Sequence, residues 1–331
     1  MSSVEYLGLA KPVNKIMPLV SVCIPTYQHA EYISECLDSV LSQKVSFPIE
    51  ILIGEDQSTD GTREICIRYA DQNPDKVRLF LNDRKDVIFI DERPSGRANF
   101  LNLYSEARGK FIAICEGDDY WTDELKLESQ VAILRENQDC SLVFHNASII
   151  VAGRHKTNFS SSLTEGFYGI ESVIRKPWFV PTPSMLFRKN LLELGEWAKY
   201  VYNGDYTIQL MLAAKFPFYY VDRVMSAYRV HEAGTSRGRE TLFHTIKLVE
   251  TLSIFNCISG FKYDRLIKNK IDGTRSEMLE NERKNILIST ILNMSYWEKA
   301  LTYRYYVYLI RHFLLFIRSK WRKLCSPKKR M

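Results

Sequence analysis

Short apolar runs alternate with helix-like stretches over the first 140 residues of the chain. Four of these runs are typical of strands, at residues 20–25, 50–54, 77–81 and 111–115. Between them, apolar positions recur at spacings of three and four, as they do in residues 33–41, and this spacing is typical of amphipathic helices. Strands that alternate with helices in this way predict right-handed βαβ units. The pattern therefore predicts an α/β fold with a doubly wound, mostly parallel sheet.

The pattern is less regular after residue 120, and it contains no internal repeat and no low-complexity segment. After Gly238 it is helical to the end of the chain, with interruptions near Gly260 and at Asp272-Gly273. Helices are also expected at 126–137 and 205–214, a polar loop at 154–166, and strands at 141–147, 184–188, 218–221 and 225–231, the last two at a sheet edge.

Three carboxylates follow the fourth strand directly, in the sequence Glu116-Gly117-Asp118-Asp119. The five apolar residues before them predict a strand buried on both faces, and open α/β sheets bind ligands at the carboxyl ends of such strands. Carboxylates this close repel one another unless a positive group lies between them. A divalent cation shared with a substrate diphosphate would supply that group. The alternative is a solvated acidic turn before the next helix.

The length and composition of the chain indicate a globular protein without a membrane span. A chain of 331 residues can bury one large core, or one core with a smaller appendage. Residues 1–14 do not read as a signal peptide, and no run of about 18 apolar residues predicts a membrane span. The seven cysteines are scattered without a Cys-x-x-Cys pair, which favours buried thiols in a reducing cytoplasm over disulfides or zinc.

The positive charge is concentrated at the end of the chain. The net charge is +6, yet residues 297–331 alone hold ten Lys or Arg residues and one Glu, so the rest of the chain is slightly acidic. Residues 297–323 combine a helical pattern with many aromatic residues and a row of arginines. Such a helix suits an anionic membrane surface. The alternative is a helix packed on the main domain with a solvated basic face; a nucleic-acid partner is not expected, because no known binding module is present.

Three strand ends carry residues suited to a nucleotide. Thr26 and Asp56 can hydrogen-bond a base, Glu116 can accept from ribose hydroxyls, and Asp118 can bind a cation. Arg97 begins a helix from which it can reach a base or a phosphate, although it can equally be a surface arginine. A P-loop and a Gly-x-Gly-x-x-Gly turn are both absent, which argues against a P-loop phosphotransferase and a dinucleotide-binding fold.

From about residue 19 to residue 236 the chain resembles the family 2 inverting glycosyltransferases, which have the GT-A nucleotide-sugar fold. Four segments match the motifs of that family in order. They are Val-Ser-Val-Cys-Ile-Pro-Thr-Tyr at 20–27, Glu-Asp-Gln-Ser-Thr-Asp-Gly-Thr at 55–62, Gly-Arg-Ala-Asn at 96–99 and Glu-Gly-Asp-Asp-Tyr-Trp at 116–121.

The resemblance implies a division of the chain. Residues 1–18 would be a lead-in, residues 19–238 a GT-A catalytic domain, and residues 239–331 a helical, basic and aromatic extension. Within the catalytic domain, about 19–120 would form the nucleotide-sugar half and about 121–238 the acceptor half.

The resemblance also implies the site residues. Glu116 stands at the first position of the family's Asp-x-Asp motif and Asp118 at the second, metal-binding position, while Asp119 would assist or cap the following helix. The segment Tyr228-Arg229-Val230-His231 is similar to the family's Tyr-Arg-x-His, which implies that His231 binds the cation, Mn²⁺ or Mg²⁺, or a phosphate. The alternative for this histidine is a structural role. The residues expected to bind the nucleotide-sugar are Pro25, Thr26, Tyr27, Glu55, Asp56, Arg97, Glu116, Gly117 and Asp118.

Asp205 is the expected catalytic base, since similar family members have theirs at this turn into a helix. Inverting transfer needs a carboxylate that takes the proton of the acceptor hydroxyl. The alternative for Asp205 is a helix N-cap, and the two roles are compatible. His145 is expected to be packed or on the acceptor side, and Trp121 and Trp178 to stack on a sugar or to lie in the core.

The predicted function is metal-dependent transfer of a sugar from a nucleotide-sugar, with a UDP-sugar as the expected donor. The expected acceptor is a hydroxyl of a glycan or lipid-linked glycan in bacterial surface-polysaccharide synthesis, lying over residues 181–188. The expected location is cytoplasmic and peripheral at the inner face of the membrane. A catalytically inactive nucleotide-sugar-binding or membrane-tethered assembly protein is the alternative. A nucleotidyltransferase fits less well, because residues 25–28 are not a glycine-rich loop.

Overall fold

The structure is a computed structural model that describes residues 3–8, 16–90, 93–160, 162–231 and 241–284. The chain forms two compact units, residues 1–270 and 271–331. The central sheet and all the site residues discussed below belong to the first unit. The predicted basic helix at 297–323 lies outside the described residues, so the membrane and packing alternatives for it stay predictions.

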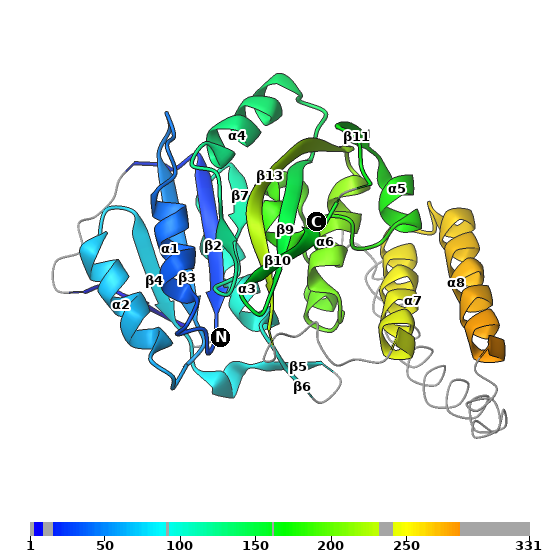
Figure 1. Cartoon of the computed structure of the whole chain (residues 1–331), viewed down its shortest axis with the longest axis horizontal. Coiled ribbons are helices and arrows are strands. Elements are labelled where there is room, and N and C mark those ends of the chain that lie inside the picture. The colour runs from blue at the N-terminus through cyan, green and yellow to red at the C-terminus, as the bar shows by residue number, and fades with distance from the viewer. Residues whose placement is uncertain (1–2, 9–15, 91–92, 161, 232–240, 285–331) are drawn as a thin grey trace, which may run out of the picture. The chain divides into compact units, whose positions relative to one another are not determined.

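One large sheet forms the centre of the first unit (Figure 1). Its main path follows the order β1-β4-β3-β2-β7-β12-β9-β13-β11, with β10 beside β9 and β8 beside β13. A small antiparallel sheet pairs β5 with β6. The strands are β1 (Val4–Tyr6), β2 (Val20–Thr26), β3 (Ile49–Glu55), β4 (Val77–Leu81), β5 (Ile88–Ile90), β6 (Arg93–Ser95), β7 (Phe111–Ile114), β8 (Tyr120–Trp121), β9 (Leu142–Val151), β10 (Arg154–Asn158), β11 (Gly166–Tyr168), β12 (Leu186–Arg188) and β13 (Phe218–Val230).

Helices connect these strands in the order that the apolar pattern predicts. The β2–β3, β3–β4 and β2–β7 pairs are all parallel, and the doubly wound α/β prediction is confirmed. The α-helices are α1 (Ile33–Leu41), α2 (Thr62–Gln72), α3 (Arg97–Glu106), α4 (Lys126–Glu136), α5 (Ile170–Arg175), α6 (Gly204–Ala213), α7 (Thr241–Ile258) and α8 (Asp264–Lys284).

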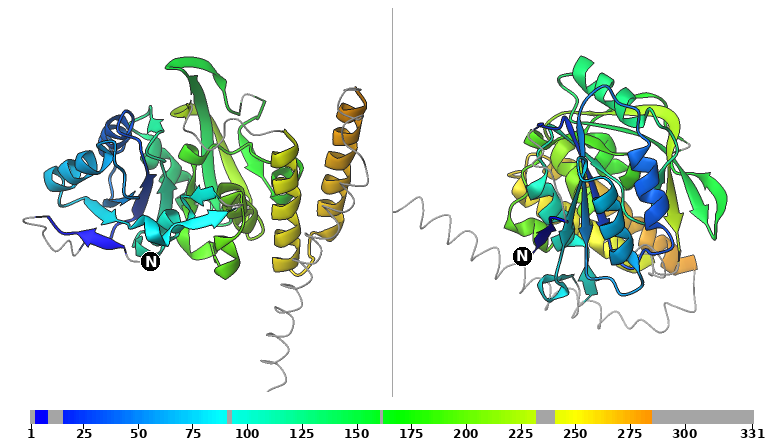
Figure 2. Two further views of the ribbon diagram at one scale, coloured as in Figure 1. Left: turned by 90° about the horizontal axis from the view of Figure 1, so that it is seen from below. Right: turned by 90° about the vertical axis from the view of Figure 1, so that its left-hand side faces the viewer.

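The two faces of the parallel strands are covered by different helices (Figure 2). Alternate residues of a strand point to opposite faces, so Val20, Val22 and Ile24 of β2 pack in one core with buried residues of α1, α2 and α4. The other face is covered by α3, whose Asn99 Nδ2 donates to the Gly54 carbonyl at 2.7 Å. A Cβ on Gly54 would lie 1.8 Å from Asn99 Oδ1, so this close contact requires glycine.

The strand order fixes where a ligand can bind. The chain places β3 and β4 on one side of β2 and then returns to place β7 on its other side. Open α/β sheets bind ligands at the carboxyl ends of the strands, near such a change of direction. Here those ends are followed by the segment after Thr26 and the segment after Ile114, which includes the predicted acidic run.

Two segments differ from the expectations. Residues 154–166 were expected to be a loop, but Arg154–Asn158 form β10, because Ala152 and Gly153 have φ of 49° and 71° and make a two-residue hairpin turn that pairs Arg154 with Val151. The two strands expected at 218–221 and 225–231 are one long strand, β13, whose pairing with β9 is irregular between Val221 and Ser226.

The described cysteines are free thiols, and five of them are buried as expected, whereas Cys257 is exposed. Among the described residues, no helix is both long and apolar enough to cross a membrane. The predicted lead-in contributes a strand, since β1 pairs with β4 at one edge of the sheet. The domain boundaries at 18/19 and 238/239 stay predictions.

A fully buried lysine lies under Trp121. Lys126 has no exposed surface, its Nζ donates to Gln130 Oε1 at 2.8 Å, and the same ammonium lies 4.0 Å from the Trp121 ring centroid. Burial lowers the pKa of Lys126 to about 7, because the charged form is disfavoured where water cannot solvate it. Trp121 is itself 4% exposed and donates from Nε1 to the Pro183 carbonyl. Trp121 therefore belongs to the core, which is one of the two roles predicted for it.

Replacing this lysine with methionine should change how stability depends on pH. Between about pH 7 and pH 10 the unfolded chain keeps the proton on Lys126 and the folded chain does not, so wild-type stability gains with rising pH. Lys126→Met lacks this gain. The difference in free energy of unfolding, variant minus wild type, should therefore fall by a few kcal/mol from pH 7 to pH 10. Urea denaturation at pH 7, 8.5 and 10 measures it, with exposed Lys76→Met as control. A difference that is constant with pH would contradict the buried-lysine assignment.

Candidate functional site

The acidic turn after β7 is held against the end of β2. Beyond the last residue of β7, Cys115 N donates to the Cys23 carbonyl at 3.1 Å, and Gly117 N donates to the Pro25 carbonyl at 3.0 Å. The turn closes through Asp119 N, which donates to the Glu116 carbonyl at 2.9 Å. The backbone thus places the 116–119 carboxylates beside the carboxyl end of β2.

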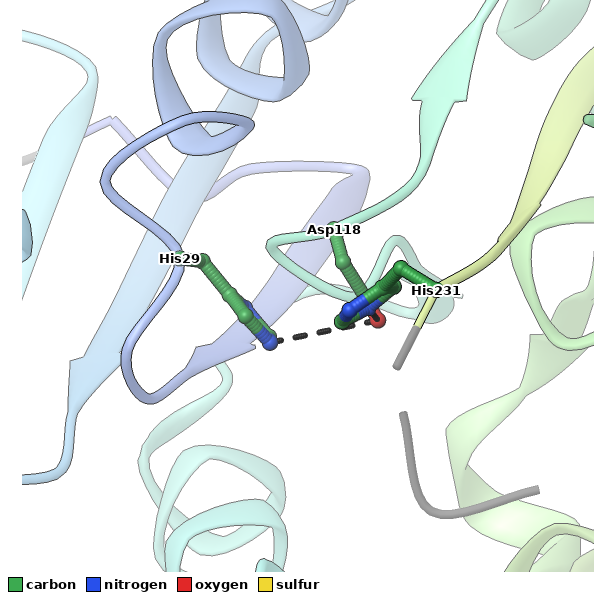
Figure 3. A group of neighbouring side chains, drawn as sticks. All are labelled: His29, Asp118 and His231. Atoms are coloured by element: carbon green, nitrogen blue, oxygen red, sulfur yellow. Dashed lines mark hydrogen bonds and ion pairs between the residues drawn. The ribbon is translucent and has the colours of Figure 1, made fainter. Parts of the chain in front are cut away.

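Asp118 lies between two histidines (Figure 3). Its Oδ2 is 2.9 Å from Nε2 of His231 and 3.9 Å from Nε2 of His29. His231 directly follows β13, and His29 lies in the loop between β2 and α1, so three distant segments converge. The three side chains are between 14% and 20% exposed, which leaves them accessible from solvent.

The ligand atoms of His29, Asp118 and His231 lie within 4.8 Å of one another, and so do carboxylate oxygens of Glu116, Asp118 and Asp119. One cation can be bound by donors at such separations. The sequence predicted Asp118 and His231 as metal ligands, and the structure brings these two side chains together. It also adds His29, which the sequence analysis did not identify.

Asp119 is buried and holds the end of β13 in place. Its Oδ1 accepts from the Arg229 amide at 2.8 Å, and Arg229 Nη1 donates to the Asp118 carbonyl at 2.7 Å. The Arg229 guanidinium also pairs with Glu35 and lies 4.3 Å from the centroid of the Tyr120 ring. Asp119 Oδ2 is buried with no hydrogen-bond partner among the described residues. These contacts fix His231, two residues beyond Arg229, beside Asp118.

The electrostatics of the turn favour a cation. Burial, together with the charges of Asp118 and Asp205, raises the pKa of Glu116 to about 8. Burial alone would raise the pKa of Asp118 as well, but the hydrogen bond from His231 and the proximity of His29 hold it below its usual value. A carboxylate whose pKa is raised by desolvation and by neighbouring carboxylates, as that of Glu116 is, is stabilised as an anion by a nearby positive charge. A divalent cation fits this donor set.

The predicted base-binding residues lie around the ends of β2 and β3. The Asp56 amide donates to the Thr26 carbonyl at 3.1 Å, and Asp56 Oδ2 accepts from Arg84 Nη1 at 3.0 Å. The guanidinium of Arg84 lies 3.8 Å from the centroid of the Tyr27 ring. Tyr27 is 39% exposed, so its ring is available to a ligand.

Glu55 is placed differently from Asp56. Its side chain is fully buried, with Oε1 accepting from the Ser58 amide at 2.6 Å and Oε2 paired with Arg63. These partners occupy both of its oxygens inside the fold. Of the two carboxylates that the sequence offered for the base, Asp56 is the one whose carboxylate lies beside Tyr27 and Arg84.

Asp205 lies in the first turn of α6, next to Arg97. The N-cap of this helix is Asn203, not Asp205. Arg97 donates from Nη1 to the Ala198 carbonyl at 2.5 Å and from Nη2 to the Tyr202 carbonyl at 3.3 Å. A Cβ on Gly204 would lie 2.3 Å from Arg97 Nη2, so glycine lets the guanidinium lie against the start of α6. Burial raises the pKa of Asp205, while the charge of Arg97 opposes that rise.

The charge of Asp205 contributes to the raised pKa of Glu116, so these two carboxylates interact electrostatically.

The sequence allows two possible roles each for His145 and Trp178. His145 is fully buried, with Nδ1 2.7 Å from the Asn146 carbonyl oxygen, as the packed alternative had it. Trp178 is half-buried, with its ring 5.9 Å from the Tyr206 ring.

The residues expected to lie under an acceptor are mostly inaccessible. β12 lies between β7 and β9 inside the sheet, and Met185, Leu186 and Phe187 have no exposed surface. Within residues 181–188, only Thr182 is half-buried rather than buried. The expectation of an acceptor lying over this whole segment is therefore wrong, since β12 has a strand on each edge and its residues are buried.

Gly117 has no room for a side chain. A Cβ there would lie 2.4 Å from Thr26 Oγ1 and 2.9 Å from His29 Nδ1. We expect Gly117→Ala to push the acidic turn away from β2 and to lower activity by about tenfold or more, because displacements of about 1 Å at a reacting centre have large effects. Steady-state kinetics measures this, with Gly169→Ala as control, since nothing lies within 4 Å of a Cβ at Gly169. Equal activity of the two variants would contradict the close packing.

The model of glycosyl transferase family 2 matches residues 21–195 of the chain. Among curated proteins, an uncharacterized protein of Mycobacterium tuberculosis is 34% identical over 174 residues, which are 52% of this chain and 47% of that protein. A GalNAc(5)-diNAcBac-PP-undecaprenol beta-1,3-glucosyltransferase of Campylobacter jejuni is 23% identical over 218 residues, 65% of each chain. The chain spans about half the length of the first of these relatives and two thirds of the second.

Solved structures share the fold. TarS of S. aureus, in complex with UDP-GlcNAc, superposes with a TM-score of 0.54 at 18% identity, over 72% of this chain and 65% of that one. The mannosyltransferase PcManGT of Pyrobaculum calidifontis, in complex with GDP-Man and Mn²⁺, gives a TM-score of 0.52 at 17% identity, over 94% and 88%. At these identities the likeness concerns the fold alone.

Proposed function

Because the chain belongs to glycosyl transferase family 2, we propose that it is a metal-dependent, inverting glycosyltransferase. In this proposal it moves a sugar from a nucleotide-sugar to a hydroxyl of a glycan or lipid-linked glycan. The observation that carries the proposal is the convergence of Asp118 and His231 at the acidic turn, where the charge of Asp205 also acts on Glu116.

The donor would lie across the ends of β2, β3 and β7. Asp56 would accept from a base N–H, and the Tyr27 ring, backed by Arg84, would offer a flat surface for the base. Thr26 and Pro25 contribute the strand end beneath it, and Glu116 would accept from the ribose. Asp118 and His231 would hold Mn²⁺ or Mg²⁺ against the diphosphate. When bound, that cation offsets the charge that develops on the leaving nucleoside diphosphate.

Asp205 would act as the general base. Its carboxylate takes the proton of the acceptor hydroxyl while that oxygen forms a bond to the anomeric carbon. The bond from the anomeric carbon to the diphosphate oxygen breaks, and both electrons leave with the nucleoside diphosphate. Arg97 lies against the start of α6 and opposes the burial-induced rise in the pKa of Asp205. It therefore favours the ionised form that a base requires, and we assign Arg97 to this role as well as to the donor side.

We prefer a UDP-sugar as donor and a polysaccharide precursor as acceptor. The structural relatives hold UDP-GlcNAc and GDP-Man, and the Campylobacter relative is named for an undecaprenol-linked acceptor. The basic, aromatic segment 297–331 supports a reaction at an anionic membrane surface. Peripheral association with the inner face of a bacterial membrane accordingly belongs to this proposal.

A donor screen tests the proposal directly. Thermal shift with Mn²⁺ across UDP-, GDP- and TDP-sugars should identify one nucleotide that stabilises the protein, and slow hydrolysis of that donor should follow on incubation without acceptor. Donor binding with no hydrolysis and no transfer would support the alternative of an inactive nucleotide-sugar-binding protein. The carboxylates at Asp118 and Asp205 favour the enzyme. Absence of binding to every nucleotide-sugar would contradict both.

A further inference from the structure

The loop between β2 and α1 brings a third nitrogen donor to the acidic turn. His29 Nε2 lies 3.9 Å from Asp118 Oδ2, while His231 Nε2 lies 2.9 Å from the same oxygen. The His29 and His231 ring centroids are 6.1 Å apart, with the rings nearly perpendicular. In Figure 3 both imidazoles converge on the Asp118 carboxylate.

These separations suit three ligands of one ion. With metal–ligand bonds of about 2.1 Å, two ligands of the same ion lie from about 3 Å to about 4.2 Å apart, depending on whether they are adjacent or opposite. The 2.9 Å and 3.9 Å separations lie close to this interval. At 3.9 Å, His29 is too far from Asp118 for a direct hydrogen bond.

The His29 imidazole is oriented by its other nitrogen. Nδ1 lies 3.2 Å from Thr26 Oγ1, and a Cβ on Gly117 would reach to 2.9 Å from the same Nδ1. A hydrogen bond at Nδ1 fixes the ring and leaves Nε2 to face the carboxylate. Ligating histidines in proteins generally have such a partner on the second nitrogen.

The backbone of this loop is held by the segment that follows β3. The amide of Gln28 donates to Ser58 Oγ at 2.9 Å, that of His29 to Thr62 Oγ1 at 2.8 Å, and that of Ala30 to Asp60 Oδ2 at 3.0 Å. Three consecutive amides are thus bonded to side chains of one neighbouring segment, residues 58–62, which ends at the first residue of α2. This arrangement places His29 in position before any ligand arrives.

We propose that His29 is a third protein ligand of the cation, through Nε2, and that the His29–Asp118–His231 set makes the site selective for first-row transition ions such as Mn²⁺ over Mg²⁺. The proposal rests on the proposed function, since it concerns the cation that faces the donor diphosphate. Mg²⁺ keeps oxygen ligands and water and binds through few protein groups. Two imidazole nitrogens suit first-row transition ions better.

The substitution His29→Asn separates ligation from packing. An asparagine amide nitrogen stands near the place of Nδ1 and can keep the bond to Thr26 Oγ1, but nothing replaces Nε2. His155→Asn is the matched control, because His155 is exposed on β10, where its Nε2 lies 3.0 Å from Asn158 Oδ1. Mn²⁺ binding to the full chain is measured by electron paramagnetic resonance, with Mg²⁺ as competitor, and the nitrogen modulation of bound Mn²⁺ is measured by pulsed methods.

We expect wild type and His155→Asn to bind Mn²⁺ equally, with modulation from two imidazole nitrogens. His29→Asn should bind Mn²⁺ about tenfold more weakly or worse, show modulation from one nitrogen, and keep its affinity for Mg²⁺ within about threefold. Unchanged modulation and affinity in His29→Asn would overturn this inference and leave the proposed function intact. A wild-type chain that binds no Mn²⁺, with or without UDP, would overturn both.

Discussion

Asp205→Asn should lower kcat for sugar transfer by about 10²- to 10⁴-fold, the range that a general base typically contributes. The amide keeps the size of the side chain but cannot accept the proton of the acceptor hydroxyl. Donor binding should be unchanged, because Asp205 acts on the acceptor. Kinetics with the donor found by the screen, together with calorimetric donor binding, separates the two effects.

The pH profile gives a second test of Asp205. Burial raises the pKa of this carboxyl above its usual range, and only the ionised form is a base. In wild type, kcat should therefore rise with pH through that raised pKa, and this acid limb should vanish in Asp205→Asn. Asp139→Asn, on an exposed residue, is the control. A variant that keeps wild-type kcat and the acid limb would show that the base lies elsewhere.

Asp118→Asn should also have a large effect on sugar transfer. The substitution removes the carboxylate charge next to His231. In the proposal, that charge holds the cation against the diphosphate. Since a cation contributes several kcal/mol to such a reaction, and each 1.36 kcal/mol is about tenfold in rate, kcat/KM should fall about a thousandfold or more.

The fold should survive this change. Asp118 is partly exposed, and the acidic turn is held by backbone bonds at Cys115, Gly117 and Asp119. Thermal unfolding of Asp118→Asn should thus stay within a few degrees of wild type. Near-normal turnover in this variant, at any Mn²⁺ concentration, would contradict a metal role for Asp118.

β7 could be predicted from sequence because it is buried on both faces, and Phe111–Ile114 forms it, one residue shorter than the apolar run. Such a strand leaves a continuous apolar run that little else explains. Val77–Leu81 forms β4 as expected, although the half-buried Arg78 interrupts its apolar residues. β10 has no such signal, since Arg154 to Thr157 are exposed and polar. Its strand conformation comes from the turn at Ala152 and Gly153 and from pairing with β9.

The site residues also differ in whether the sequence alone could identify them. Asp118 lies in a dense motif directly after a strand, so position alone indicated it. His29 and Arg84 are single polar residues in loops, and their contacts with Asp118 and Asp56 arise from the crossing of segments 28 to 89 residues apart in the chain. The one local signal for His29 was its place three residues after Thr26, just beyond the motif at 20–27 that was assigned to the nucleotide. The spacing of residues in the sequence does not show which loops come together in the fold.

The proposed reaction requires a cation that joins Asp118 and His231 to the diphosphate of the donor. Calorimetric titration of UDP into wild type and Asp118→Asn, each with Mn²⁺ and with EDTA, measures this link most directly. If UDP is the correct nucleotide, Mn²⁺ should tighten UDP binding by about ten- to a hundredfold in wild type and have no effect in Asp118→Asn. Equal UDP affinity in wild type with Mn²⁺ and with EDTA would contradict it.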